Sequence, residues 1–173
     1  MRFPAIATTL AVLIGGFTAQ AEDKKPTDKA FDKKECVSHA ASCNMKMVEL
    51  GKIMSEKAQK AEVKQFASQM VEAHSKMMSK LKTTCKEINC DFPEKPNAED
   101  QKIITQFRDE KSQNLDEAYM KLMVETHEKA VKMLTQAHKE AKDPQLQECS
   151  GEALKVMDEH LKKAQTILKD LKA

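Results

Sequence analysis

The sequence predicts an all-α protein: a four-helix bundle whose second and third long helices are joined by a long connection that contains a short helix. Two observations support this fold class. The 173 residues include only four glycines and five prolines, and aromatic residues make up only 4%. Turns need glycine and proline, and strands favour β-branched and aromatic residues, so sandwiches, barrels and glycine-loop nucleotide folds are disfavoured. From Asp32 onward, apolar residues recur every three or four positions, which is the period of an amphipathic helix.

We expect long helices over residues 32–58, 61–87, 114–141 and 144–171. The second has the most regular apolar stripe, from Val63 to Cys85. No glycine or proline separates the first two helices, so one uninterrupted helix remains an alternative. Asp143 and Pro144 mark the start of the last helix, because aspartate favours the N-cap and proline the first helical position. Each helix carries one apolar stripe, which is buried if the helices form a bundle.

The connection between the second and third long helices is interrupted by Pro93 and Pro96 and contains a short amphipathic segment at residues 99–110. A connection of this length permits a ferritin-like crossover, in which the third long helix runs parallel to the second. A simple up-down-up-down bundle would not need it. The expected fold is therefore a ferritin-like four-helix bundle.

The first residues have the pattern of a secretory signal peptide. Arg2 is followed by an apolar run, and the small residues Ala19 and Ala21 precede a charged stretch. We therefore expect residues 1–21 to be a signal peptide and the protein to be periplasmic or secreted. The apolar run is short for a bilayer span, but an uncleaved anchor remains an alternative.

The rest of the chain is expected to be a flexible, charged leader at residues 22–31 and a helical bundle at residues 32–173. No other apolar run approaches the length of a membrane span, so we expect none in the mature chain. The formal net charge of +2 gives no electrostatic reason to expect a nucleic-acid partner.

Five cysteines in an exported protein are read first as disulfides: Cys36, Cys43, Cys85, Cys90 and Cys149. Counting residues from the predicted turns favours a Cys36–Cys85 or Cys36–Cys90 bridge. The alternative is a Cys85–Cys90 bridge, which would close a small loop. The crossover topology also brings Cys149 to that end. The odd count leaves one free thiol or a disulfide-linked homodimer, and buried free thiols are the alternative.

One polar residue from each long helix falls at the same predicted level of the bundle: Glu49, His74, His127 and His160. Three imidazoles and a carboxylate in a bundle core form a plausible transition-metal site for copper, zinc or iron. Methionines flank the histidines, and thioether sulfur with imidazole suits copper, especially Cu(I). The alternatives are methionine as ordinary core filler and a satisfied buried network that includes Tyr119 and Asp116.

The sequence gives little support for catalysis. A di-iron site needs Glu-x-x-His on two helices, but Val71 and Met157 occupy the positions three residues before His74 and His160. There is no phosphate-binding loop and no local arrangement typical of a nucleophile with its base. A Cys-x-x-Cys pair is also absent, so a thiol oxidoreductase is disfavoured. We therefore expect a protein that is not an enzyme.

The order and spacing of several motifs resemble a family of secreted bacterial helical bundles, the domain of unknown function 4142. The motifs are Glu49-Leu50-Gly51-Lys52, Val63-Lys64-Gln65-Phe66-Ala67, Met70-Val71-x-x-His74, Leu115-Asp116-x-x-Tyr119 with His127, Asp143, and His160-Leu161. The resemblance implies a ferritin-like fold, a helix break near residues 58–62 and export, and it brings no activity. This chain departs from the family in having Leu115 where phenylalanine is usual and in lacking a proline before the last histidine.

Two functional hypotheses follow. The first is an exported, non-enzymatic protein that binds a transition metal in the bundle core. The second is a structural, interaction or stress-related protein of the cell envelope, whose histidines and glutamate form a purely structural network.

Overall fold

The computed structural model describes residues 31–173, and within this range it is all-helical. The helices are α1 (Lys33–Lys57), α2 (Ala61–Glu87), α3 (Ala98–Asp109), α4 (Leu115–Glu140) and α5 (Pro144–Asp170). The predicted boundaries agree with these to within one residue at each end. The expected signal peptide, and all but the last residue of the expected leader, lie outside the described residues.

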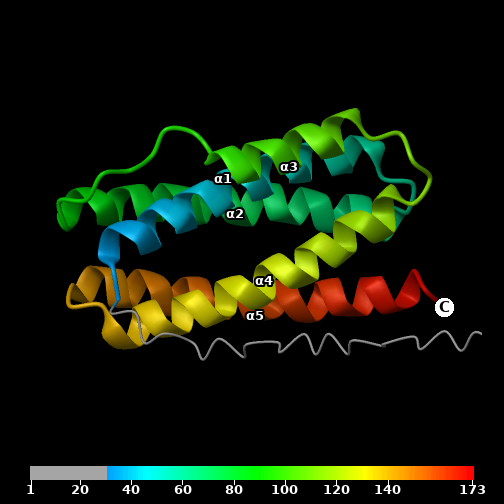
Figure 1. Cartoon of the computed structure of the whole chain (residues 1–173). Helices are drawn as coiled ribbons and strands as arrows, with labels where there is room; N and C mark the ends of the chain where they lie inside the picture. The colour runs from blue at the N-terminus through cyan, green and yellow to red at the C-terminus, as the bar shows by residue number, and fades with distance from the viewer. Residues whose placement is uncertain (1–30) are drawn as a thin grey trace, which may run out of the picture.

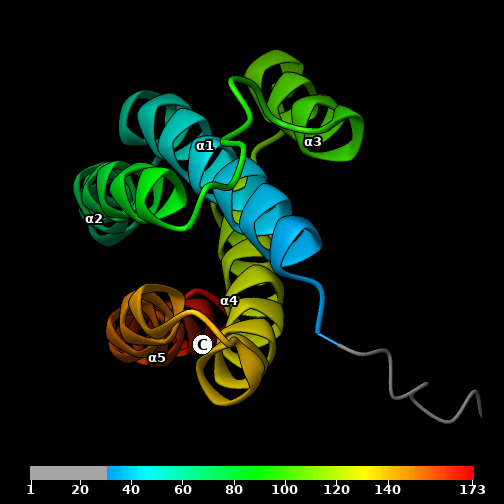
Figure 2. The same ribbon diagram turned by 90° about the vertical axis from the view of Figure 1, so that its left-hand side faces the viewer.

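Two antiparallel helix pairs form the bundle, α1 with α2 and α4 with α5 (Figure 1). The third helix, α3, runs back along the outside of α1, so that α4 begins at the end of the molecule where α2 begins (Figure 1). As a result α4 runs parallel to α2, which is the predicted crossover. Viewed along the bundle, α2 lies beside α5, and α3 packs on the outer side of α1 (Figure 2). Within the described residues no helix is long and apolar enough to cross a membrane.

The turn between α1 and α2 is fixed by a residue from the other half of the chain. The carboxylate of Asp116, in the first turn of α4, accepts hydrogen bonds from the backbone N–H of Gln59 at 3.1 Å and of Lys60 at 2.7 Å. The amides at the start of a helix lack partners within the helix, so a carboxylate there both satisfies them and complements the helix dipole. The two helices are therefore separate, and the uninterrupted alternative is wrong.

At Gly51, α1 and α2 pack too closely to leave room for a side chain. A Cβ atom built on Gly51 would lie 2.7 Å from the backbone oxygen of Ala67 and 2.7 Å from a methyl group of Val71. A backbone oxygen cannot move aside as a flexible side chain can. Glycine therefore allows these two helices to pack at this distance.

A buried polar cluster attaches α3 to α1. The carboxylate of Asp100 lies 2.6 Å from the ammonium of Lys46 and accepts a 2.5 Å hydrogen bond from the hydroxyl of Ser42. The side chains of Lys46 and Asp100 are only 9% and 8% exposed. These contacts lower the pKa of Asp100, although burial of the carboxyl opposes them. The crossover helix is thus held by a charge pair as well as by Ile104, which is packed in the core.

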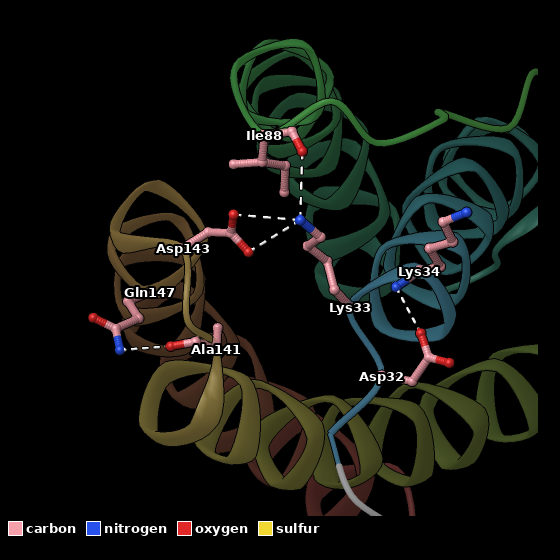
Figure 3. Close-up of polar contacts among 7 residues, drawn as sticks. All are labelled: Asp32, Lys33, Lys34, Ile88, Ala141, Asp143 and Gln147. Atoms are coloured by element: carbon pink, nitrogen blue, oxygen red, sulfur yellow. Dashed lines mark hydrogen bonds and ion pairs between the residues drawn. The ribbon is translucent and has the colours of Figure 1, made fainter.

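The end of the bundle where α2 stops and α5 starts is held together by Lys33 (Figure 3). Its ammonium contacts the carboxylate of Asp143 at 3.2 Å and donates a 3.4 Å hydrogen bond to the carbonyl of Ile88. Asp143 and Pro144 occupy the predicted N-cap and first helical positions of α5. The Asp143 side chain, however, makes no capping hydrogen bond, because it pairs with Lys33 instead.

Several of the cysteines lie at this same end, whereas Cys43 packs against the main core cluster, and the expected bridges are not formed. Cys85 and Cys149 belong to one apolar cluster, and Cys90 packs against it. All five cysteines, which lie within the described chain, are free thiols. The predicted Cys36–Cys85 or Cys36–Cys90 disulfide is therefore absent from residues 31–173, and the arrangement matches the alternative of buried thiols.

Candidate metal centre

Three histidines from three helices meet in the middle of the bundle. His74 lies on α2, His127 on α4 and His160 on α5, and one ring nitrogen of each lies within 4.8 Å of those of the other two. The ring centroids are 5.4–5.7 Å apart. His74 is 2% exposed and His127 is 1% exposed, whereas His160 is partly exposed. The prediction that these side chains share one level of the core is correct.

Each histidine is placed by the apolar stripe of its own helix. Met70 precedes His74 by one turn, Met123 precedes His127 by one turn, and both methionines are fully buried. Met157 precedes His160 and is also buried. Because residues three or four apart share a face of a helix, the burial of each methionine directs the next histidine into the core.

The orientation of the His74 ring is set by Asn44 on α1. The side-chain amide of Asn44 donates to the carbonyl of Ala40 at 2.8 Å, which leaves its oxygen facing His74. That oxygen lies 2.9 Å from His74 Nδ1. An amide oxygen can only accept, so Nδ1 carries the proton and the Nε2 lone pair of neutral His74 is free.

His127 is oriented in the same way by its own helix. Its Nδ1 donates a 2.7 Å hydrogen bond to the backbone carbonyl of Met123. The Nε2 atom of the neutral ring therefore also presents a lone pair. Histidines that bind metals in proteins are typically held by such a hydrogen bond through the other ring nitrogen.

Three buried ring nitrogens have no hydrogen-bond partner in the described part of the chain: Nε2 of His74, Nε2 of His127 and Nδ1 of His160. We call these atoms the buried nitrogen set. An unpaired polar atom in a protein core is costly, so a set of three is unusual for a purely structural cluster.

The environment keeps all three imidazoles neutral at physiological pH. Burial, and secondarily the proximity of His127 and His160, holds the pKa of His74 well below its usual range. Burial also lowers the pKa of His127, partly offset by its hydrogen bond to Met123. Burial first, and then His127 and Lys163, lowers the pKa of His160 to about 4. A neutral imidazole is the form that binds a metal ion.

Glu49, the fourth predicted ligand, is not part of this centre. Its side chain is 39% exposed and lies 2.8 Å from the ammonium of Lys52 and 3.9 Å from the guanidinium of Arg108. The prediction compared heights along the bundle but not directions around α1. Asn44 is the residue that α1 contributes to this level. Glu49 follows it by five positions, which corresponds to a rotation around the helix of roughly 500°, or about 140° net.

Tyr119 and Asp116, which were considered as partners in a satisfied network, are also elsewhere. Asp116 binds the α1–α2 turn. The hydroxyl of Tyr119 is itself buried and without a hydrogen-bond partner among residues 31–173. Its ring packs edge-on against Phe66 and Phe107, and burial raises its pKa. The structural network proposed as the alternative is therefore not formed as predicted.

A surface hollow between α2 and α5 leads toward the centre. Its lining includes His160 and the carboxylate-bearing residues Glu72 and Glu159, together with Lys76 and Lys163. The Lys76 ammonium is paired with Glu72 at 2.6 Å. His160 is thus the histidine of the centre that borders this hollow.

Comparison with known proteins identifies a family and a fold. A family model described as "Domain of unknown function (DUF4142)" matches residues 17–167. No curated protein matches the chain. Among solved structures, the chain is similar to the crystal structure of a DUF305 fragment from Deinococcus radiodurans, with a TM-score of 0.68 and 12% sequence identity. The similarity covers 82% of this chain and 99% of that one, and at this identity it establishes the helical fold alone.

Proposed function

The chain belongs to the family of the domain of unknown function DUF4142, and we propose that it is an exported, non-enzymatic protein that binds a transition-metal ion on His74, His127 and His160. The export part of the proposal rests on the signal-peptide pattern of residues 1–21. The binding part rests on the geometry of the three histidines.

One observation carries the proposal: three neutral imidazoles from three different helices each place a ring nitrogen within 4.8 Å of the others. Each of the three rings also has a buried nitrogen without a hydrogen-bond partner among residues 31–173. Two of the three rings are already held in the tautomer that leaves Nε2 available, by Asn44 and by the Met123 carbonyl. Such a site loses little entropy on binding, because the ligands need not be rotated into place.

The ligand set suits a divalent transition metal such as zinc, copper or iron. Imidazole is a good ligand for all three, whereas magnesium and calcium require oxygen. Three protein nitrogens also leave a coordination position for water or another small ligand. No carboxylate or cysteine in the described chain joins the three histidines, so the ligands that the protein supplies carry no negative charge.

The alternative is a structural cluster without a metal. In such a cluster the three atoms of the buried nitrogen set would have no hydrogen-bond partner within residues 31–173. Each buried polar group left unpaired costs about 1–3 kcal/mol. Coordination of one ion removes this cost for all three nitrogens at once, which is why we prefer metal binding.

The test is cobalt titration of the full mature chain after its metals have been removed with a chelator. Cobalt(II) is a spectroscopic probe for a nitrogen site of low coordination number. We expect saturation at one ion per chain, loss of binding in His74→Ala and His127→Ala, and normal binding in His39→Ala. His39 is an exposed histidine outside the centre, so that variant is a matched control. Equal binding by wild type and His74→Ala, or no binding by the wild type, would contradict the proposal.

A further inference from the structure

A separate cavity lies between the two helix pairs, on the side of His74 that faces the cysteine-rich end of the bundle. Its volume is about 220 Å³, and all four long helices contribute to its lining. His74 and Asn44 border it, so it adjoins the histidine centre. The other residues that line this cavity are not part of the histidine centre.

The lining of the cavity is rich in sulfur. Six of its residues are cysteines or methionines: Cys36, Cys43, Met77, Met133, Cys149 and Met157. The three thioethers come from three different helices, α2, α4 and α5. Met77 follows His74 by one helical turn and Met157 precedes His160 by one turn, so two of the thioethers lie close along the helix to the ligands of the first site.

The thiols and the thioethers differ in what they can offer a cation. Burial raises the pKa of Cys36 and of Cys43 to about 11, and burial also raises the pKa of Cys149. These thiols therefore keep their protons at neutral pH in the metal-free protein, and a cation bound through them would release a proton. A thioether has no proton to lose and presents its sulfur lone pairs at any pH.

The remaining chemistry of the cavity disfavours a hard ion. Glu152 is the only carboxylate among its lining residues in the described chain, and it is paired with Lys80 across the α2–α5 seam. Lys76, which also borders the cavity, is paired with Glu72. Soft sulfur ligands without added negative charge are selective for monovalent copper.

We propose that this cavity is a second binding site, distinct from the three histidines, that holds Cu(I) on the thioether sulfurs of Met77, Met133 and Met157. Binding is a simple coordination step: three neutral ligands donate lone pairs, no bond within the protein breaks, and no proton is released. Methionine side chains have three rotatable bonds, so the thioethers can change their orientation within the cavity when an ion binds.

The first test follows the methionine methyl groups by NMR, with silver(I) as a redox-inert probe of the same charge and softness. The chain has eleven methionines, of which Met1 lies in the expected signal peptide, and labelling the methyl carbons gives one signal for each methionine of the protein studied. Single Met→Leu variants assign the three signals of interest. We expect the first equivalent of silver(I) to shift the signals of Met77, Met133 and Met157 most. If silver(I) binds without shifting them, it is held by other groups, such as thiols or imidazoles, and the proposal is wrong.

The second test measures Cu(I) affinity by competition with a chromophoric Cu(I) chelator. Leucine conserves the volume of methionine, so the triple variant Met77→Leu, Met133→Leu, Met157→Leu should fold. We expect it to bind Cu(I) at least about tenfold more weakly and without change in proton release. The control variant, Met54→Leu with Met120→Leu, alters two methionines that are buried elsewhere in the core and should bind normally.

The two sites can fail independently. Cobalt(II) binding by the triple methionine variant reports the histidine centre alone, and silver(I) binding by His127→Ala reports the cavity alone. If the triple variant retains full Cu(I) affinity, or if the cavity takes up xenon while silver(I) leaves all methionine signals unshifted, the cavity is an apolar void and the second site does not exist.

Discussion

The side chains of Asn44 and His74 are joined across the α1–α2 interface by a hydrogen bond of 2.9 Å. This contact orients one of the three imidazoles from a helix that supplies no ligand of its own. It also holds the proton on Nδ1, which frees Nε2. Asn44 is therefore a positioning residue of the proposed metal centre.

Replacing Asn44 tests this role. We expect Asn44→Leu to weaken cobalt(II) or zinc(II) binding by about 10–100-fold, which is typical for the loss of a residue that orients a metal-binding histidine. Asn44→Asp keeps an acceptor at the same place and should retain binding. Affinities from competition with a chelator, together with the circular dichroism spectrum of each variant, distinguish this effect from unfolding. Equal affinity of the leucine variant and the wild type would rule out the positioning role.

The two described helical glycines should respond differently to alanine. Alanine raises helix propensity by about 1 kcal/mol at either position. At Gly51 the new methyl group would meet the Ala67 carbonyl and Val71, so we expect a net loss of about 1–3 kcal/mol in the free energy of unfolding. At Gly151 it would meet only the ring of His138, at 3.0 Å. That ring belongs to an exposed side chain whose one hydrogen bond shown here, to the Gln147 carbonyl, water can replace if the ring turns away. Gly151→Ala should therefore be close to neutral in urea denaturation.

The buried pair of Lys46 and Asp100 gives a third prediction. Lys46→Met leaves the Asp100 carboxylate buried without its counter-charge and should lower the free energy of unfolding by about 3 kcal/mol. The double variant Lys46→Met, Asp100→Leu removes both charges and should be more stable than the single variant. A double-mutant cycle by urea denaturation measures the coupling. If the second substitution adds to the loss, the charge pair is not what attaches α3.

The free energy of unfolding of the metal-free protein should decrease as the pH is lowered through the range where histidine titrates. The pKa values of His74, His127 and His160 are lowered on folding, so below about pH 6.5 the unfolded chain takes up protons that the folded chain does not. The contribution of these three histidines to stability is therefore fully present above about pH 6.5. It is lost as the pH falls toward the pKa of the folded state, which for His160 is about 4. Each group contributes a slope of at most about 1.4 kcal/mol per pH unit.

Urea denaturation at about pH 7 and about pH 5 measures this loss. In His127→Leu the difference between the two pH values should shrink, because one of the titrating groups is gone. In His39→Ala it should remain. A metal-free protein that is equally stable at both pH values would mean that the three imidazoles are not kept neutral by burial.

The helices were predictable from the period of the apolar residues. The crossover was suggested by the long connection, interrupted by prolines, between the second and third long helices. The level of the three histidines followed from counting residues along straight helices of constant rise. The break at Ala58 was the weakest prediction from local sequence alone, since the residue that fixes the turn, Asp116, lies far away in the chain. The family resemblance supplied this break, and the structure explains it.

The wrong ligand on α1 has a specific cause. Height along the bundle was counted but rotation around α1 was not, and Glu49 was chosen because it falls at the same level as the three histidines. The apolar stripe of α1 contained the correct signal: Asn44 lies three residues after Ala41 and four before Val48, both of which are buried. A polar residue on a buried stripe is the better indicator. The cavity, in contrast, depends on side-chain packing between four helices and had no signature in the sequence.

The hydrogen bond from Lys60 to Asp116 spans 56 residues of sequence. During synthesis the first two helices therefore leave the ribosome well before the carboxylate that completes their junction. We expect the isolated α1–α2 segment to remain loosely associated, and native docking to occur in one cooperative step after α4 has been made. Asp116 thus makes native docking of the first helix pair depend on the presence of α4.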